Sequence, residues 1–255
     1  MYPYLPEIFG IKIPSYGLMT ALAYALAIYY CVKNRKYLGI SKELLADMIF
    51  YIILGALIGG KIFFIFFNWD TFWASTLVEK LRFGFVFYGG FIGAVISLFF
   101  FVRNKKISFV KATDFFAPAL ALGHAIGRIG CFLAGCCYGK ATNSFLGVVF
   151  DNPDTLVPHH LHHTHLYPTQ LFEVFANFIL FLILAKIYKS RKKDGTTSLT
   201  YIMGYALIRF VIEFFRGDDR GSALFGLYPS QIIALILFCG ATLWLCRGFL
   251  WKNKH

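Results

Sequence analysis

Residues 124–139, HAIGRIGCFLAGCCYG, place an arginine, Arg128, in a segment that is otherwise apolar enough to lie in a lipid bilayer. A charged side chain in hydrocarbon costs about 2.5–3.5 kcal/mol on insertion scales, so this guanidinium requires a partner, a wet cavity or an anionic ligand. Glycines recur through the stretch, and positions without a side chain let a helix or a ligand approach the backbone closely. The stretch is therefore a candidate binding site, with plain helix packing as the alternative.

The composition of the whole chain excludes an ordinary soluble domain. Of its 255 residues 58% are hydrophobic, 19% aromatic and 15% charged, and the mean hydropathy is +0.63. These values predict an integral membrane protein. The net charge of +12 resides in short clusters between apolar runs, so it indicates membrane topology and not a nucleic-acid partner.

Seven apolar runs are each near the roughly 20 residues that a membrane-spanning helix needs. They cover about residues 15–32, 44–67, 85–102, 112–132, 169–188, 198–215 and 230–250. The final turns of the first, third, fifth and seventh runs, together with the segments that follow them, hold 16 of the 25 Lys and Arg residues, which places the amino terminus outside and the carboxyl terminus in the cytoplasm. We predict an all-α, polytopic fold in which residues 1–255 form a single transmembrane domain.

The longest and most polar loop, at about residues 139–168, lies on the outer side in this topology. It contains a cluster of five histidines, His159, His160, His162, His163 and His165. Imidazoles are common zinc and copper ligands, but no cysteine or carboxylate stands at a recognisable ligand spacing within the cluster. We interpret the loop as solvated and as binding metal only adventitiously, with a metal site as the alternative.

Three cysteines lie close together in the sequence at the outer end of the fourth run, namely Cys131, Cys136 and Cys137. They could form a disulfide, bind a metal or supply a nucleophile, and small packing residues are the simplest alternative. Their C-x4-C-C spacing does not match the C-x2-C spacing of zinc ribbons. The sequence therefore predicts no metal site and no cofactor.

Further charged residues stand inside the sixth and fourth runs. Arg209 and Glu213 are four residues apart, hence on one helical face, where an ion pair neutralises both. Together with Arg128, Arg209 provides two guanidinium groups from different helices near the outer half of the bilayer, which suits the phosphate of a phospholipid. Asp114 opens the fourth run, and we expect it to cap the first turn of that helix.

The stretch HAIGRIGCFLAGCCYG resembles the signature of the prolipoprotein diacylglyceryl transferase family, usually G-R-x-G-N-F-x-N-x-E-x-x-G. Similar motifs follow the family order along the chain: IPSYGLM, GALIGGKIFF, FVFYGGFIG, YPTQLFE and GYALIRFVIEFFRGD. That family has seven helices with the amino terminus outside. It transfers the diacylglyceryl group of phosphatidylglycerol to the thiol of a lipobox cysteine and releases glycerol phosphate.

The resemblance implies a transferase in the bacterial inner (cytoplasmic) membrane. Its partners are phosphatidylglycerol, the lipobox signal peptides of preprolipoproteins and membrane lipids. Arg128 and Arg209 would bind the headgroup phosphate and stabilise charge on the leaving group, and Glu213 would orient Arg209. The other implied substrate-binding residues are Tyr16, Lys61, Gly89, Gly90, Gly130, Gly139 and Arg216.

The chain departs from the family pattern at positions that matter for the chemistry. Tyr88 replaces the histidine that usually precedes the glycine pair, and with an unperturbed pKa of about 10 a tyrosine is a poor base, although it can still hydrogen-bond a phosphate or thiol. His124, one turn before Arg128, is a substitute base or a structural residue. Cysteine or alanine replaces the two asparagines and the glutamate of the signature, at Cys131, Ala134 and Cys136.

Three other functions remain open at this point. A paralogue with the same fold could transfer a glyceryl or phosphoglyceryl group to another acceptor, as the altered signature suggests. A non-enzymatic phospholipid-binding or transport protein could use the same arginines. A thiol-redox membrane protein could use the three clustered cysteines.

Overall fold

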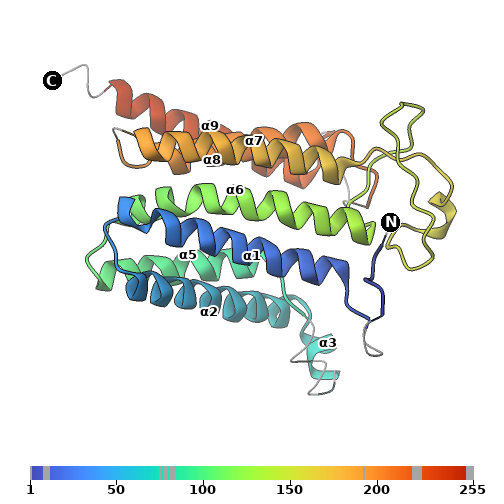
Figure 1. Cartoon of the computed structure of the whole chain (residues 1–255), viewed down its shortest axis with the longest axis horizontal. Coiled ribbons are helices and arrows are strands. Elements are labelled where there is room, and N and C mark those ends of the chain that lie inside the picture. Colours follow the sequence, from blue (N-terminus) through green and yellow to red (C-terminus); the bar gives the residue numbers. More distant parts are fainter. Residues whose placement is uncertain are drawn as a thin grey trace. The chain divides into compact units, whose positions relative to one another are not determined.

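The computed structural model describes residues 2–7, 12–74, 76, 80, 84–191, 193–219 and 226–250. Its long elements are all α-helices (Figure 1): α1 (Ser15–Asn34), α2 (Lys42–Phe67), α3 (Trp69–Ala74), α5 (Phe87–Asn104), α6 (Phe109–Ala134), α7 (Thr169–Ser190), α8 (Thr196–Glu213) and α9 (Pro229–Leu250). Short 3-10 turns occupy Arg35–Tyr37 and His159–Leu161. The seven predicted runs are confirmed as helices, because α1, α2 and α5 to α9 each begin and end within three residues of them.

The helices are those of a polytopic membrane protein. Five of them, α1, α2, α5, α6 and α7, are long and apolar enough to cross a bilayer, and α9 adds a shorter apolar stretch over Pro229–Leu245. Large apolar side chains such as Phe66, Phe175 and Trp244 are 66–77% exposed, as expected of a surface that faces lipid. Membrane crossing by α8 and α9 and the orientation of the termini stay predictions.

Residues 32–113 form one of two compact units, and glycines bring its two long helices into contact. A Cβ atom on Gly59 of α2 would overlap the carbonyl oxygen of Gly89 and lie 2.9 Å from the Cα of Gly93 in α5. A Cβ on Gly93 would in turn overlap the Gly55 carbonyl oxygen. Both glycine pairs have the four-residue spacing that places small residues on one face of a membrane helix, so their backbones pack directly.

Residues 1–31 and 114–255 form the other unit. Within it α7, α8 and α9 lie side by side, with α8 in contact with both neighbours (Figure 1). Leu180 of α7 fills the space left by Gly204 of α8, where a Cβ would lie 2.5 Å from its Cδ1. Gly130 of α6 similarly accepts the side chains of Met19 and Tyr16 from α1.

The segment between α6 and α7 folds around a small core of its own, made by Tyr138, Phe150, Val157 and Leu166. Leu166 and Val148 exchange both backbone hydrogen bonds, at 2.9 and 3.0 Å. The Nδ1 atom of His163 lies 3.2 Å from the Asp151 carboxylate within the same segment. The predicted outer loop is therefore an ordered cap on α6 and α7.

Asp114 does not cap its own helix, so that prediction is wrong. Since α6 begins at Phe109, Asp114 already lies inside it, and its buried carboxylate accepts hydrogen bonds from the backbone N–H groups of Gly195 and Ser198 at 2.8 and 2.7 Å. The Arg191 Nε lies 3.4 Å away. One carboxylate of α6 thus caps the start of α8 and pairs with the residue that follows α7.

We expect Asp114→Asn to lower the free energy of unfolding by about 3 kcal/mol, because it takes from Arg191 the nearer and buried of its two carboxylate partners and weakens the acceptors at the start of α8. The measurement is the thermal midpoint of the detergent-solubilised protein. Asp154→Asn, at an exposed carboxylate, is the matched control and should leave the midpoint nearly unchanged. Equal midpoints for the two variants would contradict the capping role.

Candidate active site

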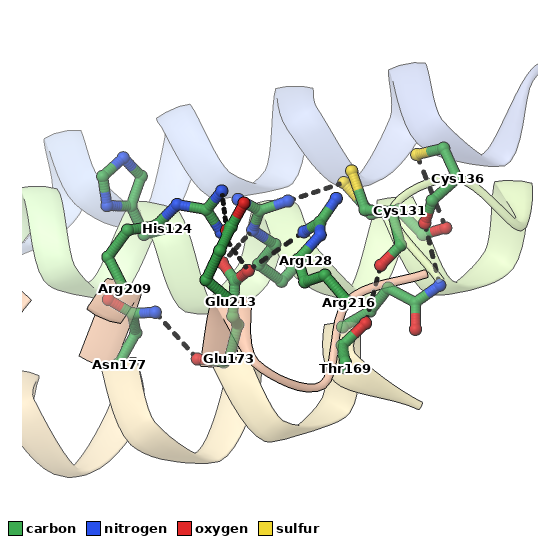
Figure 2. A network of polar contacts seen from close by, with 12 residues as sticks. His124, Arg128, Cys131, Cys136, Thr169, Glu173, Asn177, Arg209, Glu213 and Arg216 are labelled. Carbon is green, nitrogen blue, oxygen red and sulfur yellow. Dashed lines mark hydrogen bonds and ion pairs between the residues drawn. The ribbon is translucent and has the colours of Figure 1, made fainter. Parts of the chain in front are cut away.

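Glu173 of α7 lies at the centre of a cluster of charged side chains (Figure 2). Its carboxylate, only 2% exposed, contacts three guanidinium groups. The distances are 2.5 Å to Arg128 Nε, 3.4 Å to Arg209 Nη1 and 3.3 Å to Arg216 Nη1. These arginines come from α6, α8 and the segment after α8, so a single carboxylate joins four parts of the unit.

Two further carboxylates complete the cluster. Arg209 Nη2 lies 2.6 Å from Glu213, which confirms the ion pair expected from their four-residue spacing. Arg216 donates two hydrogen bonds to Asp218, at 2.8 and 2.7 Å. Burial alone would lower the pKa of Arg216, but the Asp218 carboxylate more than compensates and holds that pKa above its ordinary value. Three guanidinium groups thus face three carboxylates, and the cluster is neutral overall.

The three arginines differ in how much of each side chain a ligand can reach. The Arg128 side chain is 22% exposed, that of Arg209 13% and that of Arg216 1%. Arg216 is held on both sides by Glu173 and Asp218, whereas Arg128 makes its one carboxylate contact through Nε. Arg128 is therefore the most accessible of the three guanidinium groups to an anion.

His124 lies one turn before Arg128 on α6 and packs against α8. Its Nδ1 lies 3.3 Å from the Tyr201 hydroxyl, and its ring centroid is 5.0 Å from that of Tyr205. These contacts fix the orientation of the imidazole. Figure 2 shows His124 next to Arg209, at one end of the charged cluster. The arrangement suits a structural histidine and also a base whose ring is held by a hydrogen bond.

Three more of the predicted residues lie in the same unit. Tyr16 of α1 packs over Gly130 of α6, where an added Cβ would lie 3.3 Å from the tyrosine ring. Gly139 pairs with Arg216 in an isolated antiparallel bridge, and its N–H donates to the Tyr167 carbonyl at 2.9 Å. A Cβ at Gly139 would lie 2.5 Å from that carbonyl oxygen, so this glycine lets the segment after α6 approach Arg216.

The remaining predicted residues belong to the unit of residues 32–113 and are described there alone. Lys61 lies over the Phe85 ring, with its Nζ 4.7 Å from the centroid. Tyr88 is 57% exposed at the start of α5. The backbones of Gly89 and Gly90 lie against α2, so both glycines have a packing function in this unit.

A tight turn ends α6 beside the charged cluster. Gly135 has φ +78°, in the left-handed region, and a Cβ there would overlap the Thr155 hydroxyl. We expect Gly135→Ala to lower the thermal midpoint and the fraction of folded protein, through strain and overlap together. Gly240→Ala in α9, where a Cβ meets nothing within 4 Å, should leave the midpoint equal or higher. A midpoint for Gly135→Ala equal to the parent's would contradict this account.

Glu173 and Asp218 were not predicted as site residues from the sequence. A signal for Glu173 was present, because a carboxylate within an apolar run is by default a functional-site candidate. Asp218 follows α8 in the motif FFRGD, and nothing in its spacing distinguishes it from a surface residue.

Comparison with known proteins identifies the family. The family model described as "Prolipoprotein diacylglyceryl transferase" matches residues 3–247. The chain belongs to the prolipoprotein diacylglyceryl transferase family. The match spans every helix of both units almost to the end of α9, and it includes Arg128, Glu173 and Arg209.

Individual members of the transferase family are similar along most of this chain. The phosphatidylglycerol–prolipoprotein diacylglyceryl transferase of Clostridium tetani is 36% identical over 236 residues, which are 92% of this chain and 93% of that protein. The protein numbered 2 under the same name in Clostridium perfringens is 36% identical over 241 residues, 94% of this chain and 92% of that one. The Chlorobaculum tepidum protein of the same name is 34% identical over 258 residues, which cover 93% of this chain and 86% of that protein.

Proposed function

We propose that this protein transfers the diacylglyceryl group of phosphatidylglycerol to the lipobox cysteine of preprolipoproteins, in the inner membrane of a bacterium. The observation that carries the proposal is the convergence of Arg128 and Arg209 on Glu173, at 2.5 and 3.4 Å. Two guanidinium groups held at fixed positions suit a phosphate ester, which they can bind through paired N–H donors.

The arginines act on the leaving group. The substrate thiol loses its proton to a base, and the sulfur attacks the glyceryl carbon that carries the phosphoester oxygen. A C–S bond forms as the C–O bond breaks, so glycerol phosphate departs with the bonding electron pair and an additional negative charge. Arg128 stabilises that charge, because fixed donors in a poorly solvated site are worth more than donors in water.

The carboxylates keep the arginines in position. Glu213 and Glu173 fix Arg209, and Glu173 fixes Arg128 through Nε, which leaves the terminal nitrogens of Arg128 free of carboxylates among the described contacts. His124 is the candidate base, and Tyr88 is a candidate hydrogen-bond donor to the phosphate or thiol. His124 has the more suitable ordinary pKa, and its ring is oriented by Tyr201.

An apolar groove along α7 and α8 suits an acyl chain of a membrane lipid. It has a volume of about 600 Å³ and is lined mostly by apolar side chains, including Phe172 and Ala176 of α7 and Leu207 and Val211 of α8. Burial of methylene groups in this groove would stabilise the chain.

The decisive experiment follows a labelled diacylglyceryl group from phosphatidylglycerol to a synthetic lipobox peptide with the purified protein. A labelled thioether product supports the proposal. Absence of product from a folded protein that still binds phosphatidylglycerol would reject it. A labelled product on a different acceptor would instead favour the paralogue suggested by the altered signature at Cys131 and Cys136.

We expect Tyr88→Phe to lower the transfer rate about 10- to 100-fold, because hydrogen bonds to charged groups contribute about 1.5–3 kcal/mol. The assay is the peptide-labelling reaction, normalised to folded protein. Tyr24→Phe removes a hydroxyl from another exposed tyrosine and should keep the full rate. A Tyr88→Phe rate equal to that of Tyr24→Phe would remove the Tyr88 hydroxyl from the mechanism.

A further inference from the structure

The sulfur atoms of Cys131, Cys136 and Cys137 all lie within 4.8 Å of one another. The three thiols are free, and they meet where α6 ends and the following segment begins. In the described part of the chain no other group of histidine, cysteine or carboxylate ligands comes together in this way. In the outer segment, three of the five histidines instead contact acceptors of that segment, namely His162, His163 and His165.

We propose that Cys131, Cys136 and Cys137 form a three-thiolate site for a thiophilic metal ion, of the Zn(II) or Cu(I) class. Soft thiolate ligands select these ions. In a tetrahedral zinc site with Zn–S bonds of about 2.3 Å, neighbouring sulfur atoms lie about 3.8 Å apart, so the observed arrangement needs shifts of only about 1 Å to close on an ion. Water would complete a tetrahedral zinc site, whereas Cu(I) needs no fourth ligand.

The backbone conformation brings the three thiols together, although their C-x4-C-C spacing differs from the C-x2-C spacing of zinc ribbons. Cys137 has φ +63° and Gly135 has φ +78°, so two left-handed residues flank Cys136. They reverse the chain directly after the last turn of α6 and return Cys136 and Cys137 to Cys131. The rule that metal sites need C-x2-C describes zinc ribbons, and it does not apply to a turn of this kind.

Side chains of α7 hold the turn in place, so the positions of the thiols do not depend on contacts between them. The buried side chains of Thr169 and Gln170, at the start of α7, donate hydrogen bonds to the carbonyls of Cys137 and Cys136 at 2.7 and 2.8 Å. Figure 2 shows Cys131 and Cys136 with Thr169 below them. A site fixed in this way before binding loses little conformational entropy when an ion enters.

The neighbouring charge suits an anionic complex. Binding of Zn(II) releases three protons and gives a complex of charge −1, and binding of Cu(I) gives −2. The Arg128 Nη1 lies 3.8 Å from the Cys131 sulfur, and it can balance part of this charge. Cys136 and Cys137 are partly exposed, which provides a path of entry, whereas Cys131 is buried.

The test uses the full chain in detergent, reduced and then stripped of metal with a chelator. Separate samples receive Zn(II), Cu(I) or the spectroscopic probe Cd(II), and bound metal is counted after dialysis. We expect one ion per chain and a thiolate-to-cadmium charge-transfer band. Cys136→Ser and Cys137→Ser should each weaken binding by at least about tenfold, since even outer-shell changes have effects of that size. Cys239→Ser, at an exposed cysteine of α9, should bind as the parent does.

X-ray absorption on the zinc-loaded parent counts the sulfur ligands without any substitution. Three sulfurs support the site. A shell of nitrogen and oxygen, retention of full binding after replacement of all three cysteines by serine, or failure of the reduced protein to bind any of the three ions would overturn the proposal. The Zn(II) and Cu(I) samples decide which ion is held more tightly. The result is independent of transferase activity.

Discussion

Arg128→Ala is expected to lower the rate of diacylglyceryl transfer by about 10²- to 10³-fold, the usual effect of removing one fixed donor from a site of developing negative charge. Arg128 is the most exposed of the three clustered arginines, at 22%, and among the described residues only its Nε contacts a carboxylate. The phosphate therefore loses its most accessible guanidinium.

The same substitution should leave the fold largely intact. Without Arg128, Glu173 still contacts Arg209 and Arg216, at 3.4 and 3.3 Å. Its buried charge consequently keeps two counter-ions. Arg128→Lys keeps a positive charge but not the planar pair of donors, so its rate should lie between those of the parent and the alanine variant.

The measurement is the single-turnover rate of peptide labelling, with the thermal midpoint of each variant recorded beside it. Arg103→Ala, at an exposed arginine near the end of α5, is the control for loss of one positive charge and should keep the parental rate. An Arg128→Ala variant that is folded and still transfers at the parental rate would remove Arg128 from the site. If the parent makes no product and Arg128→Ala loses the lipid binding that the parent shows, a lipid-binding function is favoured.

The helices could be predicted because they depend on local information. Each apolar run is near the length of a membrane span, and charges or polar residues end it, so its limits follow from composition alone. The Arg209–Glu213 pair follows in the same way, since residues four apart on a helix are neighbours. Neither inference requires knowledge of which helices are adjacent.

The parts that could not be predicted depend on tertiary contacts. Asp114 caps α8, whose N-cap residue Gly195 lies 81 residues later in the chain. Glu173 meets Arg216 across 43 residues, and no spacing rule relates the two. The core around Phe150 and Leu166 was missed for a related reason: the segment is polar on average, and its few apolar residues meet only when it folds.

Glu173 is expected to be the most important single residue of the cluster for stability, and Glu173→Gln should lower the free energy of unfolding by about 3–5 kcal/mol. Removing one member of a buried ion pair leaves an uncompensated charge, which is the costly case. Here three guanidinium groups lose a shared counter-ion, and the cluster changes from neutral to a net charge of +1. For a domain of this size the loss corresponds to a fall of about 10 °C in the thermal midpoint.

A second substitution separates charge balance from packing. Arg216→Gln in the Glu173→Gln protein removes one positive charge from the place where the compensating negative charge was lost. If charge balance governs the stability, this double variant should regain part of the lost midpoint, although Arg216→Gln alone is destabilising because it removes the guanidinium that pairs with Asp218 at 2.7 Å. The sign of this coupling is a direct measure of the Glu173–Arg216 interaction, whose atoms lie 3.3 Å apart.

The opposite result would change the account of the site. Additive losses in the double variant would mean that Glu173 and Arg216 contribute independently, so the carboxylate would not be holding the guanidinium groups in place. Activity then provides the link to function: a Glu173→Gln protein that remains folded at the assay temperature should still bind phosphatidylglycerol, because its arginines are intact and less neutralised. Its transfer rate should nevertheless fall, since correct placement of Arg128 and Arg209 requires the carboxylate that both contact.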